Sequence, residues 1–193
     1  MFVLMHLGNH MMAVGGVPTH QRWLDLLRLL YRHPLVETVL LCMLVVQLIS
    51  GMGMAGGLLG RGRPGRVLGA VARWQAISGL LLGALVLVHV GAVLFGRMAL
   101  ELDTNFYFAA AGLHTPWAWF FAPYYWVGVT ALGVHLACVA HRRLPARWGA
   151  LRKLIPISLV AGGMALGALL VALMGGPLVQ VDIPARYLAT YGF

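Results

Sequence analysis

The stretch WQAISGLLLGALVLVHVGAVLF, residues 74–95, decides the fold of this chain. It contains no charged residue and is long enough to cross a bilayer, for which a helix needs roughly 20 apolar residues. One imidazole, that of His89, lies near its far end. An unsatisfied polar group in hydrocarbon costs several kcal/mol, so a histidine inside a membrane helix indicates a functional site by default.

The composition excludes an ordinary soluble domain. Of 193 residues, 61% are hydrophobic and 10% are charged, and the mean hydropathy is +0.85, which is typical of an integral membrane protein. The net charge of +9 is carried by short segments between apolar runs, a pattern of membrane topology rather than of a nucleic-acid surface. Cys42 and Cys138 lie in separate apolar runs without a CxxC motif, which argues against an iron–sulfur site or covalent haem attachment.

Five apolar segments predict an all-α fold, a polytopic membrane helix bundle that forms a single domain over residues 1–193. They are residues 1–16, 35–60, 74–95, 117–140 and 154–174. We expect helices because an isolated strand cannot satisfy its backbone in lipid. The first segment is too short to span the membrane, so it begins mid-bilayer or its start lies upstream of Met1. It lacks the positively charged start of a signal peptide, and we do not expect it to be cleaved.

The cations predict the orientation. Nine lie in two segments, 61–73 and 141–153 (Arg61, Arg63, Arg66, Arg73, Arg142, Arg143, Arg147, Arg152, Lys153), and five lie elsewhere (Arg22, Arg28, Arg32, Arg97, Arg186). The positive-inside rule therefore places the first two segments in the cytoplasm. We expect a bacterial inner (cytoplasmic) membrane protein with its N-terminus inside and its C-terminus outside. Residues 22–32 then form a loop on the outer side, which the rule disfavours.

The same orientation pairs the intramembrane polar residues by depth. His89 lies in the outer half of its helix, and His6 and His10 lie four residues apart on one face of the first helix, so His6 (or His10) can meet His89. His135 lies in the inner half of its helix, where it can meet Gln47. Paired imidazoles with small residues beside them are typical of b-type haem sites in helix bundles.

Two other readings of these histidines remain open. They can be structural groups hydrogen-bonded to neighbouring helices, or they can form a metal or proton path in a small transporter. Intramembrane carboxylates would favour the transporter, and Glu37 lies only at the mouth of its helix, where it is interfacial or accepts a proton near a quinone. The remaining histidines, which fall in expected loops or at helix ends, are expected to be solvated: His20, His33, His114 and His141. Of these, His114 could belong to a quinone pocket.

The pattern resembles the five-helix dihaem cytochrome b subunit of succinate:quinone oxidoreductases, the succinate dehydrogenase and fumarate reductase group. Trp74-Gln75-Ala76-Ile77-Ser78-Gly79 followed by His89 resembles the family's third-helix entry and ligand. His135, then Arg142-Arg143 and Trp148-Gly149, resembles its fourth-helix ligand and exit, and His6-Leu7-Gly8-Asn9 resembles the end of its first helix.

This resemblance implies that His6 and His89 ligate the iron of an outer haem b. It also implies an inner haem between the second-helix and fourth-helix positions, which here are Gln47 and His135. Glutamine is not a usual haem ligand, so one haem is expected, and an inner haem bound by His135 alone is left open. The implied role is a non-catalytic membrane subunit that passes electrons between an iron–sulfur subunit and membrane quinone, with a flavoprotein as the further partner. A stand-alone haem protein or a haem-free protein of the same fold is the alternative.

Overall fold

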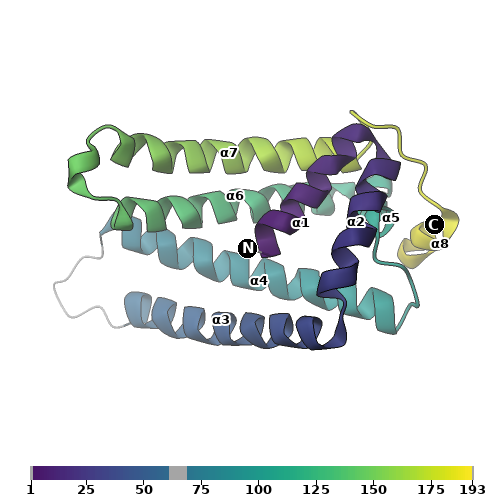
Figure 1. The fold of residues 1–193 in the computed structure, drawn as a ribbon, viewed down its shortest axis with the longest axis horizontal. Coiled ribbons are helices and arrows are strands. Elements are labelled where there is room, and N and C mark those ends of the chain that lie inside the picture. The colour runs from purple at the N-terminus through teal and green to yellow at the C-terminus, as the bar shows by residue number, and fades with distance from the viewer. Residues whose placement is uncertain (1, 61–68, 193) are drawn as a thin grey trace. The chain divides into compact units, whose positions relative to one another are not determined.

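A computed structural model describes residues 2–60 and 69–192, and no strand occurs among them. Four described helices are long and apolar enough to cross a membrane: α3 (Pro34–Gly60), α4 (Ala70–Met98), α6 (Ala118–Arg143) and α7 (Leu151–Met174) (Figure 1). They coincide with the last four predicted segments to within a few residues at each end. The prediction of an all-helical chain with long apolar helices is therefore confirmed.

The first predicted segment forms only a short helix. Residues 1–16 contain α1 (Phe2–Met11) and the 3-10 helix η1 (Met12–Gly15). At 1.5 Å per residue, ten residues span roughly 15 Å, about half of the hydrocarbon core. Within the described ranges four helices reach spanning length, and α1 is too short to span, as predicted for residues 1–16.

A second helix, α2 (Val17–Tyr31), follows directly where a loop was predicted, so that prediction is wrong. Pro18 lies in its first turn, where proline is tolerated because its missing N–H has no intrahelical partner. Val17, His20 and Leu24 are buried on one face of α2, at the spacing of a helix stripe. The chain therefore turns back at η1, and α1 and α2 pack against each other.

Short helices fill the two remaining connections. Between α4 and α6 lie α5 (Phe106–Ala111) and η2 (Gly112–His114), and after α7 lie α8 (Ala185–Leu188) and η4 (Ala189–Tyr191). Asn105 caps α5 by accepting hydrogen bonds from the N–H groups of Tyr107 and Phe108. The turn between α6 and α7 holds only η3 (Ala146–Trp148).

The chain divides into two compact units, and the charges divide with them. Unit 1 comprises Met1–Leu40, His89–Tyr125 and Ala168–Phe193, and unit 2 comprises Leu41–Val88 and Trp126–Gly167. Unit 1 holds five cations and all five acidic residues, whereas unit 2 holds nine cations and no acid. Three of those nine, Arg61, Arg63 and Arg66, lie outside the described residues.

Ion pairs in unit 1 connect segments that the sequence placed in two different outer loops. Arg28 Nη2 lies 2.8 Å from Asp103 Oδ1, and Arg32 Nη2 donates to Thr104 Oγ1 at 2.8 Å. Arg97 donates to both carboxylate oxygens of Glu37, at 2.7 and 3.3 Å. Of the cations that the positive-inside rule disfavours on the outer side, Arg28, Arg32 and Arg97 therefore have acidic or polar partners in their own unit.

Glycines let α6 and α7 approach closely in unit 2. A Cβ added to Gly133 would lie 2.6 Å from the backbone oxygen of Leu159, and one added to Gly163 would lie 3.1 Å from Gly133 Cα. Trp126 Nε1 donates to Met164 O at 3.1 Å beside this contact. Small residues at a helix interface are the usual means of close packing in membranes, where no hydrophobic effect drives helices together.

Candidate functional site

Two of the predicted site residues, His6 and His89, lie next to each other in unit 1. His6 comes from α1 and His89 from α4, and their ring centroids are 5.6 Å apart with the ring planes at 69°. The ring of Phe2 stacks on His6 at 5.9 Å and 16°, which restricts the orientation of that imidazole. The structure therefore brings together two imidazoles that lie on different helices.

Two further histidines extend this pair into a histidine cluster, which comprises His6, His10, His20 and His89. The rings of His6 and His10 lie 4.8 Å apart, and those of His10 and His20 lie 5.2 Å apart. Asn9 Nδ2 donates to His20 Nε2 at 3.1 Å. The cluster thus runs from α4 through α1 to α2.

The prediction that His20 is solvated is wrong. Its side chain is 1% exposed, and Phe106 covers it with ring centroids 5.0 Å apart. Burial above all, with the Arg28 cation adding to it and a hydrogen bond with Gln21 opposing it, lowers the pKa of His20 from 6.5 to about 4. His20 is therefore neutral at pH 7.

A helical reading of residues 17–31 would have found His20. His20, Leu24, Leu27 and Tyr31 follow one another at steps of three or four residues, which is the period of a helix face. Arg22 and Arg28 lie between these residues in the sequence. Because such cations indicated a loop, the apolar face of the helix was not recognised. The missed signal was the periodicity and not the composition.

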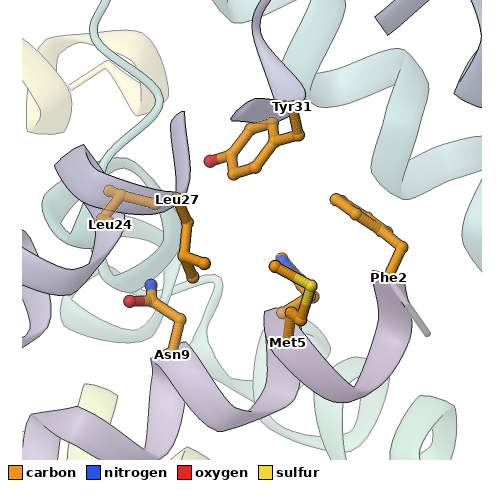
Figure 2. A pocket seen from close by; sticks show the side chains of 7 residues that line it. Phe2, Met5, Asn9, Leu24, Leu27 and Tyr31 are labelled. Carbon is orange, nitrogen blue, oxygen red and sulfur yellow. The ribbon is translucent and has the colours of Figure 1, made fainter. Parts of the chain in front are cut away.

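A pocket lies between α1 and α2 beside the histidine cluster. Phe2, Met5, His6 and Asn9 of α1 line one side, and the α2 residues of the stripe line the other: Leu24, Leu27 and Tyr31. Figure 2 shows these side chains converging on the space between the two helices. The cavity is small, with a volume of about 10 Å³, which is about enough for one water molecule.

The third predicted site residue, His135, lies in unit 2. Its Nδ1 is 3.4 Å from Ser78 Oγ, and a Cβ added to Gly79 would lie 3.2 Å from its Cε1. Because the Ser78 hydroxyl donates to Gln75 O, it can accept a hydrogen bond from His135 Nδ1. The imidazole therefore packs directly on the backbone of α4.

Unit 2 supplies no second imidazole opposite His135. Its only other histidine is His141, which lies six residues further along α6 and so on the same helix. At the neighbouring α3–α4 contact, a Cβ added to Gly83 would lie 3.2 Å from Leu48 Cδ2, so an α3 side chain already fills the space beside this glycine. These observations favour a structural role for His135.

The remaining polar candidates have structural partners or lie at the surface. His114 donates from Nε2 to Met174 O at 2.8 Å and thereby satisfies a carbonyl at the end of α7, so it is bonded and not solvated as predicted. His33 is exposed and His141 is half-buried. Glu37 is paired with Arg97, as described above.

The histidine cluster offers only imidazole nitrogens as ligands for a metal ion or a metal-containing cofactor. In the part of the chain that the structure describes, no three His, Cys, Asp or Glu side chains are placed to hold a metal ion together. A haem iron takes only two protein ligands, because the macrocycle supplies the others. His6 and His89, whose ring centroids lie 5.6 Å apart, are the two imidazoles that would hold such an iron.

No protein-family model matches this chain, and no curated protein or solved structure is detectably similar to it.

Proposed function

We propose that this protein is an integral membrane cytochrome b that carries one haem b, ligated by His6 and His89, and transfers electrons in the membrane. The observation that supports this most directly is the contact between the two imidazoles, which come from α1 and α4 and lie 5.6 Å apart. Paired histidines are a standard axial ligand set for haem. The haem would supply one-electron redox chemistry, and the chain would set its orientation and environment.

The protein's own residues account for how such a group would be held. Phe2 stacks on His6 and fixes its ring plane, and the apolar lining of the α1–α2 pocket offers a water-poor surface next to that ring. A dry surround strengthens every electrostatic interaction of a bound cofactor. The pocket alone is too small to enclose a macrocycle, so a haem at His6 would also require movement of flexible side chains such as Met5.

An inner haem is not part of this proposal. His135 faces Ser78 and Gly79, and Gln47 is the residue that stands where the resemblance places a ligand. A single haem in unit 1 would leave unit 2 without a redox group.

The partners follow from the resemblance and from the charges. We propose that the cationic segments of unit 2 face the cytoplasm, with the N-terminus inside and the C-terminus outside in a bacterial inner membrane. An iron–sulfur subunit and a flavoprotein would then dock at the cytoplasmic side, and membrane quinone would exchange electrons with this chain. The nine cations of unit 2, against five in unit 1, support this orientation, because the positive-inside rule counts lysines and arginines.

The experiment is a count of haem in purified protein. We expect a reduced-minus-oxidised spectrum of a b-type cytochrome and about one haem per chain by the pyridine haemochrome assay. His89→Ala and His6→Ala should each lose the low-spin signal of a bis-imidazole site. His135→Ala should keep it, and His33→Ala is a matched control because His33 is exposed.

The outcomes separate the alternatives. A protein without b-type absorbance after expression in haem-sufficient cells would refute the proposal. Two haems per chain, one of them lost in His135→Ala, would show that unit 2 binds a second haem without a second imidazole. Haem that is still bound in both His6→Ala and His89→Ala would show that other residues ligate it.

A stand-alone cytochrome is the second candidate, and the lack of a second imidazole in unit 2 favours it. With one haem, the route to a cytoplasmic iron–sulfur cluster would be long. Affinity purification from the native membrane distinguishes the two functions: co-purification of an iron–sulfur protein and a flavoprotein supports the subunit role. A haem-containing chain that purifies alone and is reduced by quinol supports the stand-alone role.

A further inference from the structure

Two arginines near the end of α2 form a partly buried cluster that the proposed haem ligation does not use. Arg28 lies in α2 and Arg32 directly follows it, and their side chains are 11% and 29% exposed. Both contact Asp103, which lies in the connection between α4 and α5. The Nη2–Oδ1 distances are 2.8 Å for Arg28 and 3.8 Å for Arg32. Arg32 also donates to Thr104 Oγ1.

These contacts leave donors of both guanidinium groups without a partner. The Nε atoms of Arg28 and Arg32 are buried and have no hydrogen-bond acceptor. A buried donor without an acceptor destabilises the folded state, and more so when the group is charged. Such a group in a native structure calls for an explanation such as an ordered water, an ion or a ligand.

The local charges are also not balanced. Asp103 is shared by the two guanidinium groups and is itself 40% exposed. Asp25 lies 3.5 Å from Arg28 but is 68% exposed, so water screens it. Glu37 is paired with Arg97 and is not available to the cluster. Burial first, and then the neighbouring Arg28 cation, lower the pKa of Arg32, so the positive charge exceeds its compensation at this position.

A purely structural role explains the Asp103 contacts but not the rest. A single arginine paired with Asp103 would be enough to join α2 to the connection between α4 and α5. The second arginine, Arg32, adds a partly buried positive charge, whose desolvation costs free energy unless it is paired. Two guanidinium groups with free Nε donors are suited to a planar or tetrahedral oxyanion, which arginine binds through parallel N–H bonds.

We propose that Arg28 and Arg32 bind one oxyanion, a carboxylate or phosphate group belonging to a membrane-embedded molecule. Two sources offer this chemistry: a propionate of the haem and the phosphate of a phospholipid headgroup. The haem source rests on the proposed function, since Phe2 joins His6 to Tyr31, the neighbour of Arg32 in sequence, through ring contacts of 5.9 and 5.6 Å. The lipid source does not depend on it, because basic pockets near the membrane surface bind lipid headgroups.

The test uses the full chain in detergent and a charge-preserving double variant, Arg28→Lys with Arg32→Lys. Lysine keeps the positive charge near Asp103 but has no Nε donor and no planar fork. Arg22→Lys on the same helix is the matched control, because Arg22 is exposed. Helix content by circular dichroism verifies folding, and Arg32→Lys alone is the milder variant if the double variant does not fold.

Two measurements distinguish the sources. Dioleoyl phosphatidylglycerol and dioleoyl glycerol, which lacks the phosphate, are titrated separately and followed by native mass spectrometry. Haem b and its dimethyl ester, in which both propionates are blocked, are compared as ligands of haem-depleted protein by absorbance.

Either of two results supports the site. A lipid headgroup predicts that the wild-type preference for phosphatidylglycerol falls at least tenfold in the double variant and is unchanged in Arg22→Lys. A propionate predicts that the wild-type preference for haem b over its ester falls by a similar factor. The proposal is overturned if wild type and double variant do not differ in either preference. If the chain binds no haem, the lipid titration alone tests the oxyanion site. Failure of the haem proposal is thereby distinguished from failure of the oxyanion proposal.

Discussion

The imidazoles of His6 and His89 lie with their ring centroids 5.6 Å apart, although two complete helices, α2 and α3, separate them along the chain. The contact forms because α1 is short and turns back at η1, so that its histidine face remains within unit 1 beside the second half of α4. Whatever group these rings bind, α1 and α4 must both contribute to it.

Removal of the His89 side chain should leave a space that free imidazole can enter. In His89→Gly, the low-spin spectrum should be lost, and 10–100 mM imidazole (about the range in which weak ligands bind) should restore it, because the His6 ligand remains in place. His10→Gly is the matched comparison, since His10 contacts His6 but is not proposed as a ligand. Restoration in His10→Gly but not in His89→Gly would assign the ligand role to His10 instead.

The close approach of α6 and α7 predicts opposite effects for two glycines. Gly133→Ala should lower the free energy of unfolding by about 1–3 kcal/mol, because the new Cβ would lie 2.6 Å from Leu159 O and the helices would have to separate. Gly162→Ala should be neutral or stabilising by up to about 1 kcal/mol, because nothing lies within 4 Å of its Cβ and alanine favours helix. Unfolding in mixed detergent micelles measures both variants. Equal effects would show that α6 and α7 do not pack through these glycines.

The Arg97–Glu37 pair should couple the ends of α3 and α4 that lie in unit 1. Both side chains are about a quarter exposed and meet through two hydrogen bonds, so we expect a coupling free energy of about 1 kcal/mol in a double-mutant cycle of Glu37→Gln and Arg97→Met. Glu101→Gln is the control, because Glu101 is exposed on the adjacent connection. Strict additivity of the two substitutions would contradict a coupled pair.

The buried state of His20 predicts a loss of stability in acid. Its pKa is about 4 in the folded protein and 6.5 in the unfolded chain, so the folded state binds fewer protons between these values. The stabilisation is therefore fully present above pH 6.5 and is lost as the pH falls toward 4. Between pH 7.5 and pH 5 the loss from this residue is about 2 kcal/mol.

The comparison of His20→Gln with wild type isolates this contribution. The variant should be less stable at pH 7.5 but should lose less stability on going to pH 5. His33→Gln should show the wild-type pH dependence because His33 is exposed. A wild-type pH profile retained in His20→Gln would place the sensitivity on other groups.

The long helices could be predicted from the sequence because their signal is local. An uncharged apolar run of about 20 residues has essentially one stable conformation in lipid, since only a helix satisfies its backbone without partners. The stretch 74–95 needs no information about its neighbours, and α4 indeed contains it. The same holds for the runs that became α3, α6 and α7.

Only the tertiary structure decided the course of the N-terminal residues and the environment of each histidine. The helix α2 combines cations with a buried face, and its charges are tolerated because Asp103 and Thr104, some 70 positions later, supply partners. His20 is buried because Asn9 and Phe106 cover it. The periodicity of its own helix indicates a buried face, but not which side chains cover it. A membrane helix is determined by its own residues, whereas the burial of a single side chain is determined by segments that folding brings together from elsewhere in the chain.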